Sequence, residues 1–90
     1  MKLFPVSMFV VRGKSMIPDY KPGDYVITFN WTDVRAGDVV IFKLNEKNYI
    51  KRVRKTLKGL VEVAGDNEKE SSKIGPVKRS DIIGRVVLLY

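Results

Sequence analysis

The sequence predicts an all-β fold, a compact and mostly antiparallel sheet that curls or closes into a partly open barrel. Glycine and proline recur about every ten residues, and the runs between them are short and rich in Val, Ile, Phe and Tyr. No segment keeps a helical period over eleven residues or more. Ninety residues suffice for one core, so residues 1–90 are expected to form a single domain.

Short strands separated by turn residues account for most of the chain. The polar residues 45–48 are expected to form a hairpin loop, and Lys58-Gly59 a turn in which Gly59 is free to take positive φ. Strands joined by such short loops pair antiparallel. A single helical turn is possible after Ser15. The strands are expected at residues 8–12, 25–29, 38–44, 49–55, 60–64 and 82–89.

The sequence contains neither cysteine nor histidine. Disulfides and thiolate metal sites are therefore excluded, and the commonest metal ligand and the commonest general base are missing together. We expect no metal and no cofactor. Any hydrolytic chemistry has to use lysine, a carboxylate or tyrosine.

Seventeen Lys and Arg against ten Asp and Glu give a net charge of +7. Such an excess fits a solvated surface, anionic lipid headgroups or nucleic acid. The basic residues are spread along the chain, which favours a soluble or membrane-facing domain over a nucleic-acid-reading stripe. The apolar run at residues 3–11 contains Pro5 and is far shorter than the roughly 20 residues of a spanning helix, so no transmembrane segment is expected here.

Ser15 and Lys51 are the candidate catalytic pair. A serine hydroxyl is a poor nucleophile at neutral pH and needs a base. In a strand, Lys51 lies on the same face as the apolar Tyr49 and Val53, while Arg52 lies on the other. An inward lysine loses hydration, which favours its neutral form and makes it a candidate base. The alternative is a lysine whose apolar stem is buried while its ammonium reaches the surface.

Several motifs follow in a fixed order: Ser15-Met16-Ile17-Pro18, then Pro22-Gly23-Asp24, Gly37-Asp38-Val39-Val40, Lys51-Arg52 and Gly65-Asp66-Asn67. The order and residue types resemble the type I signal peptidases, serine endopeptidases with a Ser/Lys pair, over residues 10–87. The resemblance implies an oxyanion hole from the Ser15 backbone N–H, helped in many members by a serine two positions earlier. That position is Gly13 here, so the side-chain donor is absent and we expect a modest enzyme.

The resemblance also implies where a substrate binds. A pocket would accept the small side chain before the cut, and an extended substrate would add to the open edge of the first strand. Met16 is equally well explained as a core residue. The implied substrate-binding residues are Met16, Tyr20, Tyr49 and Ile50 in the pocket, with Val10 and Val11 on the strand.

Two supporting roles are implied as well. Ser71 stands at the spacing where a serine hydroxyl would hydrogen-bond Lys51 and orient it. The usual Asp-Ser-Arg is missing after Ser71, so either Ser71 or Ser72 could have this role. Asp66 would pair with Arg52 and brace the site. The alternative for Gly65-Asp66-Asn67 is an ordinary turn.

The predicted function is a signal-peptidase-I-type endopeptidase that removes leader peptides after a small residue through a Ser15 acyl-enzyme, with Lys51 as base. The expected partners are a precursor or leader peptide and a membrane contact or membrane-anchored partner, without nucleic acid. The family's membrane helix is absent from these residues, so it was removed, is supplied by a partner or never existed. The enzyme would then be membrane-associated on the extracytoplasmic face, or cytoplasmic if it is a soluble maturation protease.

Three alternatives remain. The first is a soluble protease that matures a precursor such as that of nickel superoxide dismutase. The second is a self-cleaving SOS-repressor-type Ser/Lys protease, for which the fourteen residues before Ser15 leave little room. The third is a small basic β domain that binds single-stranded nucleic acid through Tyr and Phe, a reading based chiefly on charge.

Overall fold

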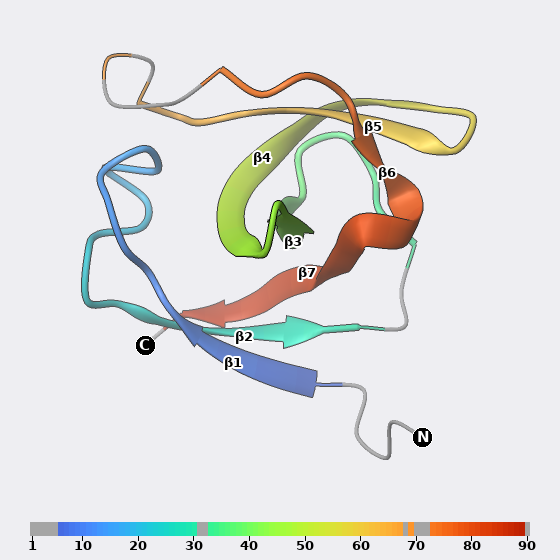
Figure 1. Cartoon of the computed structure of the whole chain (residues 1–90). Coiled ribbons are helices and arrows are strands. Elements are labelled where there is room, and N and C mark those ends of the chain that lie inside the picture. Colours follow the sequence, from blue (N-terminus) through green and yellow to red (C-terminus); the bar gives the residue numbers. More distant parts are fainter. Residues whose placement is uncertain (1–5, 31–32, 68, 70–72, 90) are drawn as a thin grey trace.

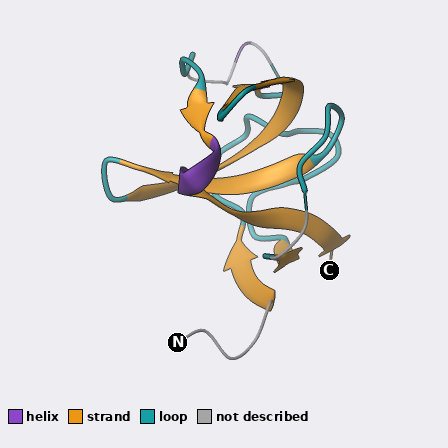
Figure 2. Ribbon diagram, turned by 90° about the vertical axis from the view of Figure 1, so that its right-hand side faces the viewer, coloured by secondary structure: helices purple, strands orange, loops and turns teal. Residues whose placement is uncertain are grey.

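The computed structural model describes residues 6–30, 33–67, 69 and 73–89. Within this part of the chain, one antiparallel sheet runs in the order β1-β2-β7-β3-β4-β5-β6 (Figure 1). This confirms the all-β prediction, because the described residues form strands, turns and a 3-10 helix but no α-helix (Figure 2). The elements are β1 (Val6–Val10), β2 (Tyr25–Phe29), β3 (Val39–Leu44), β4 (Lys47–Leu57), β5 (Leu60–Ala64), β6 (Val77–Lys78), the 3-10 helix η2 (Arg79–Asp81) and β7 (Ile82–Leu89).

Strand β3 lies at the centre and separates two apolar cores. Val40 and Phe42 point into one core, with Val53 of β4 and Ile82 of β7. The alternate residues Val39 and Ile41 belong to the second core, whose members also include Val11, Met16, Val26 and Ile50. A strand buried on both faces reads as a continuous apolar run, which is why residues 39–42 show no polar alternation.

The sheet curls around β3 without closing, so it is an open sheet rather than a barrel. Figure 1 shows β1 and β2 on one side of β3, and β4 and β5 on the other. β1 and β6 stand at the two ends of the strand order, so each keeps one edge without a strand partner among the described residues. The edge of β1 is the one expected to be open.

The predicted strands at residues 25–29, 60–64 and 82–89 match the structure. The first strand ends at Val10 instead of residue 12, because Val11 turns to bond the next loop: its N–H donates to Asp24 O at 2.8 Å and its carbonyl accepts from Gly23 N at 2.9 Å. Gly59 has the expected positive φ of 75°.

The predicted four-residue hairpin loop at residues 45–48 is wrong in length. Lys47 and Asn48 continue the ladder, so the turn contains only Asn45 and Glu46, with φ of 51° and 66°. Two successive positive φ values characterise the tight turn that best matches strand twist. Strand β6, with Val77 buried against β5, was not predicted.

Candidate active site

The loop between β1 and β2 carries Ser15 and is fixed at both ends. Gly13, with φ of 75°, provides the sharp turn before Ser15. After Ser15 the chain makes a hydrogen-bonded turn over residues 16–20, in which Tyr20 N donates to Met16 O at 2.9 Å and the Ile17-Pro18 peptide is cis. The single helical turn that the sequence allowed does not form. Met16 is only 1% exposed and anchors this turn in the second core. Ser15, which is half-buried, is therefore held next to a rigid core residue.

Asn67 fixes the loop from the other side. Its backbone N–H donates to Ser15 O at 2.7 Å, and its side-chain Nδ2 donates to Lys14 O at 3.1 Å. Asn67 therefore binds the main-chain carbonyls of Lys14 and Ser15, one on each side of the Ser15 Cα. Sequence reasoning missed this role for Asn67, since nothing in the tripeptide itself indicates a partner 52 positions earlier.

Lys51 is a buried cation in the middle of β4. It lies opposite Val40 of β3, and its side chain and Val53 are 3% and 1% exposed. Burial lowers the pKa of the Lys51 amine below its ordinary value of 10.5, because the charged form loses its hydration. The neutral amine is the form that can accept a proton.

Ser15 and Lys51 line the same cleft, which has a volume of about 760 Å³. One wall consists of residues 8–15, from β1 and the loop after it, and the other of residues 47–51 of β4. Val26 and Ile41 contribute from β2 and β3. β1 and β4 are not neighbours in the sheet, so the curl of the sheet places them across from each other.

The other predicted site residues divide into two groups. Val10, Val11, Tyr49 and Ile50 line the cleft together with Gly13. Met16 and Tyr20 are not among its lining residues, because both pack into the second core. Burial raises the pKa of the Tyr20 phenol, so it stays protonated at neutral pH. Ser71 and Ser72 lie outside the described residues.

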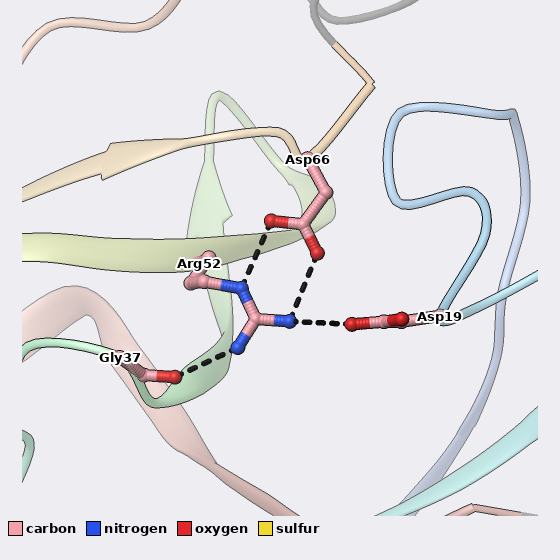
Figure 3. Close-up of polar contacts among 4 residues, drawn as sticks. All are labelled: Asp19, Gly37, Arg52 and Asp66. Carbon is pink, nitrogen blue, oxygen red and sulfur yellow. Dashed lines mark hydrogen bonds and ion pairs between the residues drawn. The ribbon is translucent and has the colours of Figure 1, made fainter.

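Arg52 ties together four segments around the site (Figure 3). Its Nε and Nη2 donate to the two carboxylate oxygens of Asp66, each at 2.9 Å. Nη2 also donates to Asp19 Oδ2 at 3.0 Å, and Nη1 donates to Gly37 O at 2.8 Å. Arg52 and Asp66 form a charge-assisted bidentate pair. Hydrogen bonding to Asp66 raises the pKa of Arg52.

The Arg52–Asp66 ion pair expected from the sequence is thus present, whereas Asp19 was not anticipated as its second partner. Asp19 lies on the turn that follows Ser15, so Arg52 binds the loop that carries Ser15 directly. The signal in the sequence was weak, because an aspartate after proline in a loop reads as a turn residue.

The described residues contain neither a cluster suited to a metal ion nor a helix suited to span a membrane. No group of three or more acidic side chains within this part of the chain is placed to hold a metal ion. None of the helical segments described has the length and apolar character that crossing a bilayer requires.

Sequence comparisons relate the chain to known proteins. A signal peptidase I from Bacillus caldolyticus is 36% identical over 58 residues, which cover 59% of this chain and 32% of that relative. The chain thus spans about a third of the length of this relative, and the match confirms the resemblance to signal peptidases. A family model described as Peptidase S24-like matches residues 4–87. Because that match covers nearly all of the sequence, the chain belongs to the Peptidase S24-like family of peptidases.

Proposed function

We propose that the protein is a serine endopeptidase that cleaves a precursor after a small residue, with Ser15 as nucleophile and Lys51 as general base. The observation that carries the proposal is that the serine of the matched motif and a buried lysine line one cleft. Membership of a peptidase family supports the reaction class.

The proposed reaction has two steps. The neutral Lys51 amine takes the proton from Ser15 Oγ as the oxygen bonds to the carbonyl carbon, and the resulting ammonium returns it to the leaving amine as the C–N bond breaks. Water then attacks the ester carbon as Lys51 takes its proton, and the Lys51 ammonium gives this proton to Ser15 Oγ as the C–Oγ bond breaks, which releases the acid product. The Ser15 backbone N–H is the proposed oxyanion donor. Gly13 adds no hydroxyl, and the loss of one donor can lower kcat about a hundredfold.

The substrate is proposed to lie extended between the two walls of the cleft. The free edge of β1 can donate and accept main-chain hydrogen bonds in the manner of an added strand. Three lining residues are proposed to surround the small side chain before the cut: Tyr49 and Ile50, which directly precede Lys51 in the sequence, and Val11, which precedes Ser15.

A leader peptide presented at a membrane is the proposed natural substrate. The name of the signal peptidase I relative supports this choice. So does a group of exposed apolar side chains on the two neighbours of β2, which can contact lipid peripherally on the extracytoplasmic face. These side chains are Val6, Met8 and Val10 of β1 and Leu88 of β7, which lie on the same face of the sheet.

The test compares wild type with Ser15→Ala and Lys51→Met on a peptide with alanine one and three places before the cut. Mass spectrometry measures the site and rate of cleavage in detergent. Both variants are expected to lose about a thousandfold or more in kcat. Ser15→Ala removes the oxygen proposed to attack the carbonyl, and Lys51→Met removes the amine proposed to transfer the proton. Lys43→Met, an exposed lysine of β3, is the matched control and should cleave normally.

The pH profile adds a second readout. The wild-type rate should rise with pH through an apparent pKa below 10.5, as the Lys51 amine loses its proton. Equal cleavage by wild type and both variants would overturn the proposal.

A further inference from the structure

The cleft is lined by cations and, among its described lining residues, by no carboxylate. Arg12 and Lys14 belong to the wall that carries Ser15. Lys47 lies at the start of the opposite wall, and the buried Lys51 lies at its other end. The first three are exposed. The remaining lining residues are apolar or uncharged.

Of the nearby carboxylates, Glu46 lies in the turn before Lys47 and outside the lining of the cleft, and four others are bound elsewhere. Asp19 and Asp66 bind Arg52 on the other face of β4. Asp24 and Asp38 accept hydrogen bonds from the backbone of Lys21 and Arg35 in their own turns, at 2.8 and 2.9 Å. The cleft therefore keeps a positive potential that an incoming ligand would meet.

Strand geometry fixes where Lys47 lies relative to the reaction. Lys47, Tyr49 and Lys51 alternate along β4, so all three lie on the same face. Four residues at about 3.3 Å each place Lys47 roughly 13 Å from Lys51 along the wall. An extended substrate has the same rise, so this distance corresponds to about four substrate residues.

The direction follows from the proposed pocket. Tyr49 and Ile50 are proposed to hold the residue before the cut, and Lys47 lies further along the same wall. It therefore faces the part of the substrate that precedes the pocket. Arg12 and Lys14 stand beside Ser15 on the opposite wall.

We propose that the cleft selects precursors whose leader carries an aspartate or glutamate about four residues before the cut, bound by Lys47. This rests on the proposed function and names its substrate class. The apolar lining and the free edge of β1 fit an extended polypeptide, which supplies main-chain bonds and alternating side chains. A nucleic-acid backbone cannot use that edge as a strand does.

The test measures binding to Ser15→Ala, which keeps peptides uncleaved, by fluorescence anisotropy. Three peptides share alanine one and three places before the cut and differ four places before it, where they carry Glu, Gln or Lys. The Glu peptide should bind about three- to tenfold more tightly than the Gln peptide at low salt, and the Lys peptide most weakly. At about 1 M salt the Glu and Gln peptides should bind with nearly equal affinity, because salt screens the charge on Lys47.

Variants in the Ser15→Ala background assign the effect to one residue. Lys47→Gln should abolish the preference for Glu, and Lys47→Glu should reverse it in favour of the Lys peptide. Lys55→Gln is the control, because it removes the same charge from an exposed position of β4 outside the cleft. An equal effect of Lys55→Gln, or a Lys47→Gln variant that keeps the preference, would overturn the proposal.

Two further results separate this inference from the proposed chemistry. If wild type cleaves the Glu, Gln and Lys peptides with equal kcat/KM, the endopeptidase proposal stands and the selectivity fails. If no peptide is cleaved but the binding order holds, the acidic-peptide site stands and the chemistry fails. A single-stranded oligonucleotide that binds Ser15→Ala more tightly than the Glu peptide and depends on Lys47 would assign the cleft to nucleic acid instead.

Discussion

Lys51 and Arg52 are neighbours in sequence, yet they occupy opposite environments on the two faces of β4. The Lys51 side chain is almost completely excluded from water, and that burial lowers its pKa. The Arg52 side chain is 30% exposed and is held by two carboxylates and a carbonyl, and its pKa is raised. Strand alternation is enough to give two adjacent cations these different surroundings.

The comparison shows how one strand can hold both a buried lysine, the proposed base, and an arginine that braces the loop carrying Ser15. Removing a cation from water costs stability, whereas a bidentate pair with Asp66 stabilises the charged form. Arg52 connects β4 to the loop that carries Ser15 through Asp19, and to the segment that holds Ser15 O through Asp66. Three substitutions measure this contrast.

Arg52→Met is expected to have the largest effect on folding. It removes both ion pairs and the bond to Gly37 O, and it leaves Asp66, whose side chain is 22% exposed, without its partner. We expect the free energy of unfolding to fall by about 1–3 kcal/mol. Urea denaturation measures the change from the midpoint at constant slope.

Arg54→Met is the matched control, since Arg54 is an exposed arginine of the same strand. It should change the free energy of unfolding by no more than about 0.5 kcal/mol. If Arg52→Met lowered the free energy of unfolding by no more than Arg54→Met does, the hydrogen-bond network in Figure 3 would contribute little to stability.

Lys51→Met should have the opposite sign and raise stability, by about 1 kcal/mol as a typical single-site effect. The unfolded chain binds a proton at Lys51 up to about pH 10.5, whereas the folded chain releases it at lower pH. The stability of wild type therefore rises with pH between the lowered pKa and 10.5. The advantage of Lys51→Met should be largest at low pH and shrink as the pH approaches 10.5.

Thermal unfolding of Lys51→Met and wild type at several pH values gives this difference directly. Lys55→Met, at an exposed position of the same strand, is the matched control for the loss of a lysine charge and should not reproduce the advantage of Lys51→Met. If the advantage of Lys51→Met were constant with pH, burial of the Lys51 charge would not be the source of the effect.

The sequence predicted this contrast better than it predicted the ends of the elements. Period-two alternation places Lys51 inward and Arg52 outward whatever the tertiary detail, and turn-bounded apolar runs located β2, β5 and β7. The Asn45-Glu46 turn was missed, because glutamate is not typical of two positive φ values and only the ladder of β3 and β4 enforces them. Strand β6 has two residues, too few to show any period.

The residues that line the cleft could be predicted where the proposed chemistry sets the residue type, and not where packing does. Ser15 and Lys51 were chosen for reactivity, and the curl of the sheet brings them into one cleft. Met16 was expected in the substrate pocket but is a core residue, because side-chain type alone cannot separate these environments. Asp19 and Asn67 act through long-range contacts with Arg52 and Ser15, which leave no local pattern.

Asp19→Asn should have the smallest effect and sharpens the comparison between the two partners of Arg52. Asp19 has a 58% exposed side chain and one bond to Arg52, whereas Asp66 is 22% exposed and makes two. Exposed ion pairs contribute about 0–1 kcal/mol, so Asp19→Asn should lower the free energy of unfolding by no more than about 0.5 kcal/mol. Urea denaturation of Asp19→Asn, Asp66→Asn and the double variant forms a cycle in which Asp66→Asn should account for most of the loss. A larger loss for Asp19→Asn would place the main support of the Ser15 loop on Asp19, and Asp66 would then be the secondary partner of Arg52.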